Sequence, residues 1–291
     1  MTSTAKTHFA RLAVLAATLI WGTSFVVMKN TLDGVPPFFL LAFRFLVAGL
    51  ILGVIFIGRM LRATKADWLR GMLTGLFLFA AYAFQTIGLQ HTTPGKNAFL
   101  TSVYCILVPF LSWAVHRVRP DQYNLSAAFL CMIGVGLVSL DGSLAMGIGD
   151  VLTLICGFFF SVHLLAVASF SNRTDVFVLT TLQFLTSGVC SLLFALITNE
   201  AVVTPRAEDW FGLVYLALFA TTAALLLQNI GQKYLSASGV AILLSLESVF
   251  GVLCSVMVYG ERPTLRMCIG FAGIFAAVIL SETKLSFLKR R

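Results

Sequence analysis

The chain has 291 residues, of which 59% are hydrophobic and only 11% are charged, and its mean hydropathy is +0.95. A soluble domain of this length cannot bury so much apolar surface, so the composition excludes a soluble protein and favours one that lies in a lipid bilayer. The net charge of +8 comes from basic residues in short loops and in the C-terminal tail. Because these residues do not form one patch, we expect no nucleic-acid partner.

Apolar runs separated by turn residues fill almost the whole chain. A helix needs about 20 apolar residues to cross the hydrocarbon core of a bilayer. Ten runs meet this need, at 9–29, 36–58, 68–89, 95–115, 124–140, 148–169, 175–197, 209–232, 237–259 and 264–282. The sequence therefore predicts an all-α integral membrane protein with ten transmembrane helices.

The basic residues of the loops predict the orientation. If the N-terminus is cytoplasmic, fourteen Lys and Arg residues fall on the inner side and five on the outer side. Cytoplasmic loops carry such an excess of basic residues. An odd number of spans would place the basic tail outside, so the bias favours an even number. We expect a multi-pass protein of the cell (inner) membrane with both termini in the cytoplasm.

The middle of the chain repeats itself. A shift of 143 positions, without a gap, superimposes identical residues, among them Gln85 on Gln228, Gly88 on Gly231, Ala98 on Ala241, Leu100 on Leu243, Ser102 on Ser245, Arg119 on Arg262 and Pro120 on Pro263. Two similar halves with five spans each must insert in opposite orientations, as in many secondary transporters. We expect inverted five-helix repeats over 1–145 and 146–291.

The first two spans of each half also match, at other shifts. Trp21-Gly22 and Phe25 correspond to Cys156-Gly157 and Phe160, a shift of 135. In the second spans, the counterparts of Arg44, Leu46 and Gly49 are Gln183, Leu185 and Gly188. The different shifts indicate loops of different length between the helices.

Short motifs with this order and spacing run along the chain. They are LIWGTSF from Leu19 to Phe25, Arg44 in the second span, LESVFG from Leu246 to Gly251 and YGERP from Tyr259 to Pro263. Together with the ten spans they resemble the EamA-type branch of the drug/metabolite transporter superfamily. The resemblance implies two five-span repeats and transport of small molecules, but it names no substrate.

The chain departs from the pattern of that family in two places. Val118 precedes Arg119-Pro120 where the family often has an acidic residue. Proline is common near the middle of both the fourth and the ninth spans, but only Pro109 of the fourth is present. We therefore expect the two helices to kink unequally.

Two charged residues lie deep in predicted spans, where each costs roughly 3 kcal/mol or more unless it faces protein or water. Arg44 is a candidate contact for a substrate anion or, as the favoured interpretation, a link between helices. Glu247 is a candidate contact for a cationic group, a carrier of a coupling proton, or the partner of Arg44. Because the sequence shows no relay of titratable groups beside Glu247, we favour the ion pair with Arg44.

Uncharged polar and aromatic side chains complete the candidate substrate site. The repeat-related Gln85 and Gln228 offer donors and acceptors to a substrate, or else bond between helices. His163 is a weaker candidate, since an interior histidine with a local partner explains it better. The remaining candidates are Trp21, Tyr82 and Tyr104, which lie within spans rather than at the interfacial belt and need partners for their polar tips.

These features favour a secondary transporter, an exporter or exchanger that moves a small organic metabolite, such as an amino acid or an amphiphilic drug-like compound, by alternating access. The rival classes are an integral-membrane enzyme and a facilitative channel. The sequence has no nucleotide-binding loop, nucleophile elbow or metal-ligand spacing, so we expect no enzyme, no cofactor and no metal. The sequence gives no signal for an oligomeric state.

Overall fold

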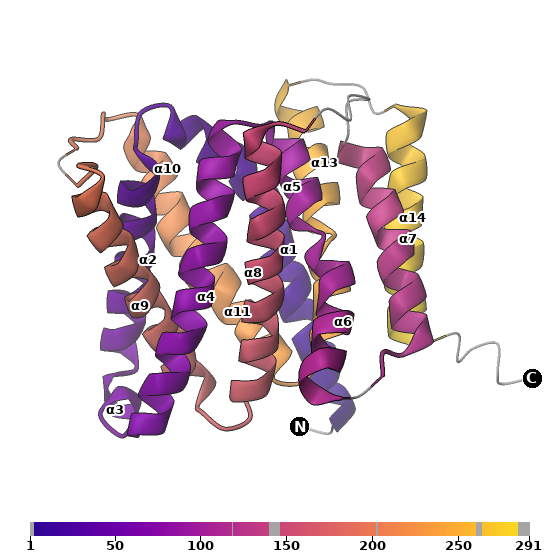
Figure 1. The fold of residues 1–291 in the computed structure, drawn as a ribbon, viewed down its shortest axis with the longest axis horizontal. Coiled ribbons are helices and arrows are strands. Elements are labelled where there is room, and N and C mark those ends of the chain that lie inside the picture. The colour runs from indigo at the N-terminus through magenta and orange to yellow at the C-terminus, as the bar shows by residue number, and fades with distance from the viewer. Residues whose placement is uncertain (1–2, 118, 140–145, 202, 260–263, 285–291) are drawn as a thin grey trace, which may run out of the picture.

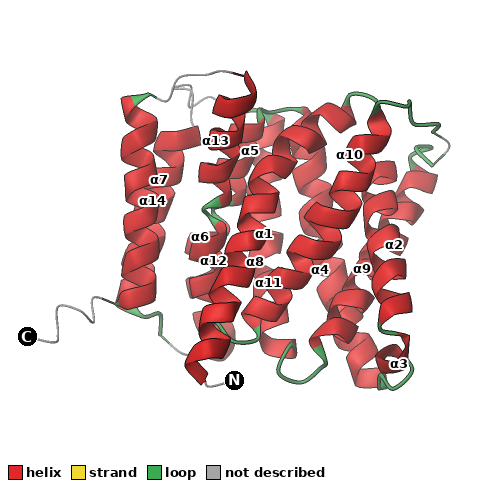
Figure 2. Ribbon diagram, turned by 180° about the vertical axis from the view of Figure 1, so that it is seen from behind, coloured by secondary structure: helices red, strands yellow, loops and turns green. Residues whose placement is uncertain are grey.

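The structure is a computed structural model that describes residues 3–117, 119–139, 146–201, 203–259 and 264–284. Within these residues every regular element is helical (Figure 2). The YGERP motif lies largely outside them, at residues 260–263, as does Val118. The helices stand side by side as a bundle, and the start of α1 and the end of α14 lie at the same end of it as α3 (Figure 1).

The helices of the first half are α1 (Ser3–Leu32), α2 (Pro37–Ile55), α3 (Ile57–Met60), α4 (Lys65–Gln90), α5 (Pro94–Thr101), α6 (Tyr104–His116) and α7 (Gln122–Ser139). Those of the second half are α8 (Ile148–Phe170), α9 (Val176–Ile197), α10 (Asp209–Tyr215), the π-helix η1 (Leu216–Ala223), α11 (Ala224–Gln232), α12 (Ala237–Leu244), α13 (Glu247–Tyr259) and α14 (Leu265–Thr283).

Seven helical segments are long and apolar enough to cross a bilayer, namely Ala5–Leu32, Pro37–Ile55, Lys65–Gln90, Pro94–Val115, Ile148–Phe170, Val176–Ile197 and Asp209–Gln232. Three shorter apolar helices of 10–17 residues cover Gln122–Leu137, Ala237–Gly251 and Leu265–Ser281 within the described part of the chain. The protein is therefore an all-helical, multi-pass membrane protein, as the composition predicts.

Helices of the two halves pack against each other rather than within separate bundles. α2 packs on α9, α7 packs on α14, α4 packs on α8 and α9, and in return α11 packs on α1 and η1 packs on α2. The contact of α2 with α9 is reciprocal at matching residues. A Cβ atom on Gly49 would lie 2.8 Å from Leu185 Cδ2, and one on Gly188 would lie 2.8 Å from Leu46 Cδ2. Glycine thus permits the close approach of backbones on which helix packing in lipid depends.

Two spans that hydropathy predicts as continuous are broken in the middle, at the same repeat position. α5 ends at Thr101 and α6 begins at Tyr104, while α12 ends at Leu244 and α13 begins at Glu247. Short i→i+3 backbone bonds replace the α-helical ones at both breaks, from Cys105 to Ser102 (3.0 Å) and from Ser248 to Ser245 (3.2 Å). Pro109, from which the sequence predicts a kink in one span only, lies inside α6. The breaks occur before it and are present in both spans.

A serine occupies both breaks. The Ser102 hydroxyl donates to Ala98 O (2.9 Å), and the Ser245 hydroxyl donates to Ile242 O (2.5 Å). Serine side chains that bond to nearby carbonyls compete with the helical ladder and bend it. The matching serines therefore give a local reason for matching breaks.

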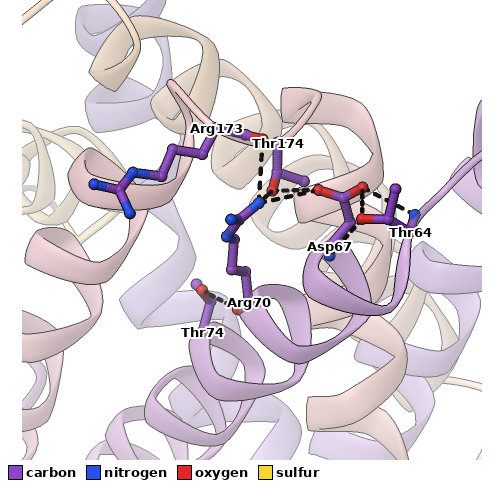
Figure 3. A network of polar contacts seen from close by, with 6 residues as sticks. All are labelled: Thr64, Asp67, Arg70, Thr74, Arg173 and Thr174. Atoms are coloured by element: carbon purple, nitrogen blue, oxygen red, sulfur yellow. Dashed lines mark hydrogen bonds and ion pairs between the residues drawn. The ribbon is translucent and has the colours of Figure 1, made fainter.

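Polar networks join the halves at both ends of the bundle. At the end that carries α3, the Asp67 carboxylate accepts hydrogen bonds from Thr64 (2.7 Å) and from Thr174 of the α8–α9 loop (2.7 Å) (Figure 3). Arg70 donates to Asp67 (3.4 Å) and to Arg173 O (3.2 Å). The start of α4 is thereby tied to a loop of the other half.

The opposite end has a related contact. Arg206 pairs with Asp209 at the start of α10 (3.0 Å), and both side chains lie against Gly34 of the α1–α2 loop. Nearby, Glu200 accepts the backbone N–H of Phe38 (2.7 Å), one of the donors that a helix start leaves unpaired. Each half thus holds the loop of the other.

The reciprocal glycine contact predicts the effect of adding one methyl group. Gly188→Ala should lower the free energy of unfolding by about 1–3 kcal/mol, because the new Cβ would also lie 2.9 Å from the backbone nitrogen of Leu46. Gly53→Ala on α2 is the matched control, since its nearest neighbour is Thr181 Cγ2 at 3.7 Å. Unfolding measured in detergent should show a loss for Gly188→Ala only. Equal stability of both variants would contradict the close packing of α2 on α9.

Candidate functional site

A cavity lies where α1, α2, α4, α8 and α11 meet the two broken spans. Its lining consists of Trp21, Ser24, Phe25, Met28, Arg44, Tyr82, Gln85, Thr101, Tyr104, Phe160, Leu164, Gln228, Leu244 and Glu247. The free volume is about 40 Å³, and one water needs roughly 10–15 Å³ on that measure. This conformation therefore leaves room for a few waters, and its walls would have to part for a metabolite.

The structure brings seven of the eight predicted site residues together in this lining. They are Trp21, Arg44, Tyr82, Gln85, Tyr104, Gln228 and Glu247. The eighth, His163, is buried outside the lining and its Nε2 lies 3.0 Å from Gln183 Oε1. His163 therefore has a local hydrogen-bond partner, as we expect from the sequence for an interior histidine outside the substrate site.

Arg44 is held by three kinds of contact. Its Nε donates to Thr221 Oγ1 (2.6 Å) in η1, and one terminal nitrogen lies 3.7 Å from Met28 Sδ. The guanidinium also stands over the Tyr82 ring, 4.7 Å from the centroid, where the ring quadrupole attracts a cation. These contacts leave the charge in a site that is 2% exposed.

The π-helix shapes the wall behind Arg44. The hydroxyls of Thr221 and Thr222 donate to carbonyls five residues earlier, those of Leu216 (2.7 Å) and Ala217 (2.8 Å). The Trp21 indole N–H donates to Ala220 O in the same segment (2.8 Å). Short π-helical segments are frequent at functional sites, and this one anchors two side chains of the cavity.

Glu247 takes its partner from the other broken span. The Tyr104 hydroxyl donates to Glu247 Oε1 (3.1 Å), and the shift of 143 places these two residues at the same repeat position. The first residues of α6 and α13, the second helices of the two broken spans, therefore touch each other between the halves.

The expected ion pair between Arg44 and Glu247 is not formed. Arg44 bonds to Thr221 and Met28, whereas Glu247 bonds to Tyr104. The two charges thus line one cavity while each has its own partner. The sequence could not exclude the pair, because it gives no distance between α2 and α13.

The two glutamines have different environments. Gln85 Nε2 donates to Thr101 Oγ1 (3.3 Å), which also lines the cavity. Gln228 Nε2 donates to Gln232 Oε1 one turn along α11 (3.0 Å). Both amides face the cavity, and neither bonds to the other.

Several lining residues were not predicted. Thr101 and Leu244 are repeat mates, as are Phe25 and Phe160, so the shifts of 143 and 135 carried a signal for these four. Ser24, Met28 and Leu164 had no such signal. Thr221, which holds Arg44, resembles many other threonines in apolar helices.

Comparisons with known proteins agree with this architecture. The model of the "EamA-like transporter family" matches residues 8–140 and again 147–283. The chain belongs to the EamA-like transporter family. This result confirms the resemblance to the drug/metabolite transporter superfamily.

The relatives of this EamA-family member carry transporter names. An "Uncharacterized transporter" of Archaeoglobus fulgidus is 34% identical over 94% of this chain and 86% of its own. The "Uncharacterized transporter YetK" of Bacillus subtilis is 28% identical over 93% and 87%. A "WAT1-related protein" of Arabidopsis thaliana, described as chloroplastic, is 26% identical over 70% of this chain and 52% of its own.

A solved crystal structure shares the fold. It superimposes with a TM-score of 0.80 over 96% of this chain and 98% of its own, at 21% identity. This likeness shows the fold alone, whereas the family and the relatives support a membrane transporter.

Because the two buried charges have separate partners, their removal should have separate effects. Arg44→Gln and Glu247→Gln should lower the free energy of unfolding additively, to within about 0.5 kcal/mol. Tyr104→Phe and Glu247→Gln should instead couple by roughly 0.5–1.5 kcal/mol, because they share one hydrogen bond. Unfolding of the three single and two double variants in detergent gives both cycles. Strong coupling of Arg44 with Glu247 would restore the ion-pair interpretation.

Proposed function

We propose that this membrane transporter is a secondary carrier that exports or exchanges a small organic metabolite by alternating access. In this proposal ten helices cross the cell (inner) membrane as two inverted repeats, 1–145 and 146–291, with both termini in the cytoplasm. The end of the bundle that carries α3 is then the inner end. The substrate binds in the cavity between the repeats.

The observation that carries the proposal is the cavity at the two matching helix breaks. Transporter sites with inverted repeats lie near the bilayer midplane and are formed by discontinuous helices. Here both broken spans contribute, through Thr101 and Tyr104 of one and Leu244 and Glu247 of the other. The small free volume fits a conformation closed around its site.

The chemistry of the lining indicates the kind of substrate. A guanidinium from Arg44, a carboxyl group from Glu247 and the amides of Gln85 and Gln228 stand among aromatic rings. Such a site suits a small molecule with a polar or charged head and an apolar body, such as an amino acid or an amphiphilic compound.

The rival classes explain the same features less well. An enzyme would need a nucleophile or an acid–base pair in the lining, but Glu247 bonds to a tyrosine and His163 lies elsewhere. A channel has no need of matching helix breaks or of a cavity closed to a few waters. Transport of a solute without chemical change therefore fits best.

Purified protein in liposomes should move a small organic solute without ATP. We expect uptake of at least one member of a panel of labelled amino acids and amphiphilic cations, with saturation and with exchange against internal solute. Arg44→Gln should reduce this flux strongly, because it removes the only Arg or Lys among the described residues that line the cavity. Flux that does not saturate would favour a channel, and chemical conversion of a panel member would favour an enzyme.

The same liposomes test energy coupling. If Glu247 takes the coupling proton, an imposed pH gradient drives wild-type flux, and Glu247→Gln removes that response while exchange remains. If Glu247 only accepts the bond from Tyr104, the wild-type flux does not respond to the gradient. The two outcomes assign different roles to one carboxyl group.

The orientation predicts where reporter enzymes work. Fusions at the N-terminus and at the C-terminus should both be active with a cytoplasmic reporter and inactive with a periplasmic one, because of the excess of basic residues on that side. A fusion in the loop after α9, near Thr204, should show the reverse. An outer C-terminus would contradict both the even number of spans and the inversion of the repeats.

A further inference from the structure

The outer ends of α5 and α8 are joined by an ion pair that crosses from one half to the other. Lys96 Nζ lies 2.6 Å from Asp150 Oδ2, and the Asp150 side chain is 3% exposed. The Thr92 hydroxyl donates to the other carboxylate oxygen (2.9 Å). Removing the partner of a buried charge is costly, so this contact resists separation of the two helices.

Polar contacts continue from this ion pair down to the cavity. The Asn97 amide donates to Thr153 Oγ1 of α8 (2.8 Å) and to Gln85 O (3.3 Å), and Gln85 lines the cavity. The helices behind are in close contact as well, since a Cβ atom on Gly88 would lie 2.7 Å from Thr153 Oγ1. On the outer side, therefore, hydrogen-bonded side chains cover the cavity.

The repeat shows what stands at the inner end in place of these residues. The shift of 143 equates Lys96 with Gly239 and Asn97 with Val240, and the shift of 135 equates Asp150 with Leu15. The counterparts on α12 and α1 can form neither an ion pair nor a side-chain hydrogen bond. The inner contact is apolar where the outer contact is charged.

A groove opens at that inner end. It is lined by Ser112, Leu165, Ala168, Ser169, Asn172, Arg173 and Ala237, from α6, from α8 with the loop after it, and from the start of α12. Leu165 is the neighbour of Leu164, which lines the cavity. The Arg173 side chain points away from the Asp67 network (Figure 3), so it does not take part in that link between the halves.

We infer that the Lys96–Asp150 pair, supported by Thr92, is the latch of the outer gate. Opening the cavity outward requires α5 and α8 to separate at this end and the ion pair to break. At the inner end the counterparts of these residues, Gly239, Val240 and Leu15, have no charge and cannot form such a pair. The latch therefore holds the carrier closed to the outside, and its loss shifts the population towards outward-open states. This inference rests on the proposed alternation of access.

The test measures access to the cavity, not flux. Ser24→Cys places a thiol in the lining, on a tryptic peptide (residues 12–29) that contains no native cysteine. In intact cells, a membrane-impermeant maleimide should modify it slowly, and adding Lys96→Met should make the reaction roughly tenfold faster. Lys96→Arg, which keeps the charge, should react at nearly the parent rate. Mass spectrometry of the peptide measures the rate.

Arg59→Met is the matched control, because it breaks the ion pair of Arg59 with Asp175 (2.9 Å) at the inner end. It should leave the outer labelling rate unchanged. If Lys96→Met does not fold, Thr92→Val decides, since it removes only one bond to Asp150 and should raise the rate by a smaller factor. A folded Lys96→Met or Thr92→Val variant that is labelled at the parent rate would overturn the latch.

The outcome is separate from that of the liposome experiment. Faster labelling without flux of any solute in the panel would support the latch at the outer gate and reject the proposed substrates. Flux of a solute with an unchanged labelling rate would support the proposed carrier function and reject the latch. Labelling of inverted vesicles shows from which side of the membrane the thiol becomes accessible. The faster reaction must occur from the face that bears Lys96.

Discussion

A polar group inside a bilayer must find its partner within the protein, because lipid offers none. In this chain several of these partners come from the opposite half. Arg44 and Trp21 of the first half bond to Thr221 and Ala220 of the second, and Tyr104 bonds to Glu247. The contacts that satisfy these buried polar groups therefore also join the two halves. Any rearrangement of the halves must exchange these partners for a substrate, for water or for one another.

Much of the fold could be predicted from the sequence, because hydropathy and repetition act over many residues. The apolar runs located the long helices, and the shift of 143 related the glutamines and the serines that the structure places at matching positions. The helix breaks could not be predicted from hydropathy, since Ser102 and Ser245 lie in runs that remain apolar. The π-helix had no signal either, because Thr221 and Thr222 also suit an ordinary helix.

The sequence predicted which residues line the candidate site better than it predicted which of them contact each other. Charged, amide and aromatic side chains are costly in lipid, so their presence within spans already indicated an interior cavity. Which of them touch depends on helix packing, and single residues do not reveal it. The ion pair expected between Arg44 and Glu247 shows the limit. Both charged residues are visible in the sequence, but nothing in it indicates that Arg44 donates its hydrogen bond to Thr221 instead.

The two halves have matching helices but different side chains at several matching positions, and this difference affects the energies of the conformations. Arg44 beside Met28 in the first half corresponds to Gln183 beside His163 in the second, so the same contact is charged in one half and uncharged in the other. Under the proposed alternating access, identical inverted halves would make the inward-open and outward-open conformations equal in energy. A charged residue whose repeat counterpart is uncharged removes that equality, as Arg44 does at the cavity and Lys96 at the proposed outer end. The asymmetry of the side chains, rather than the symmetry of the backbone, then decides which side the resting carrier faces.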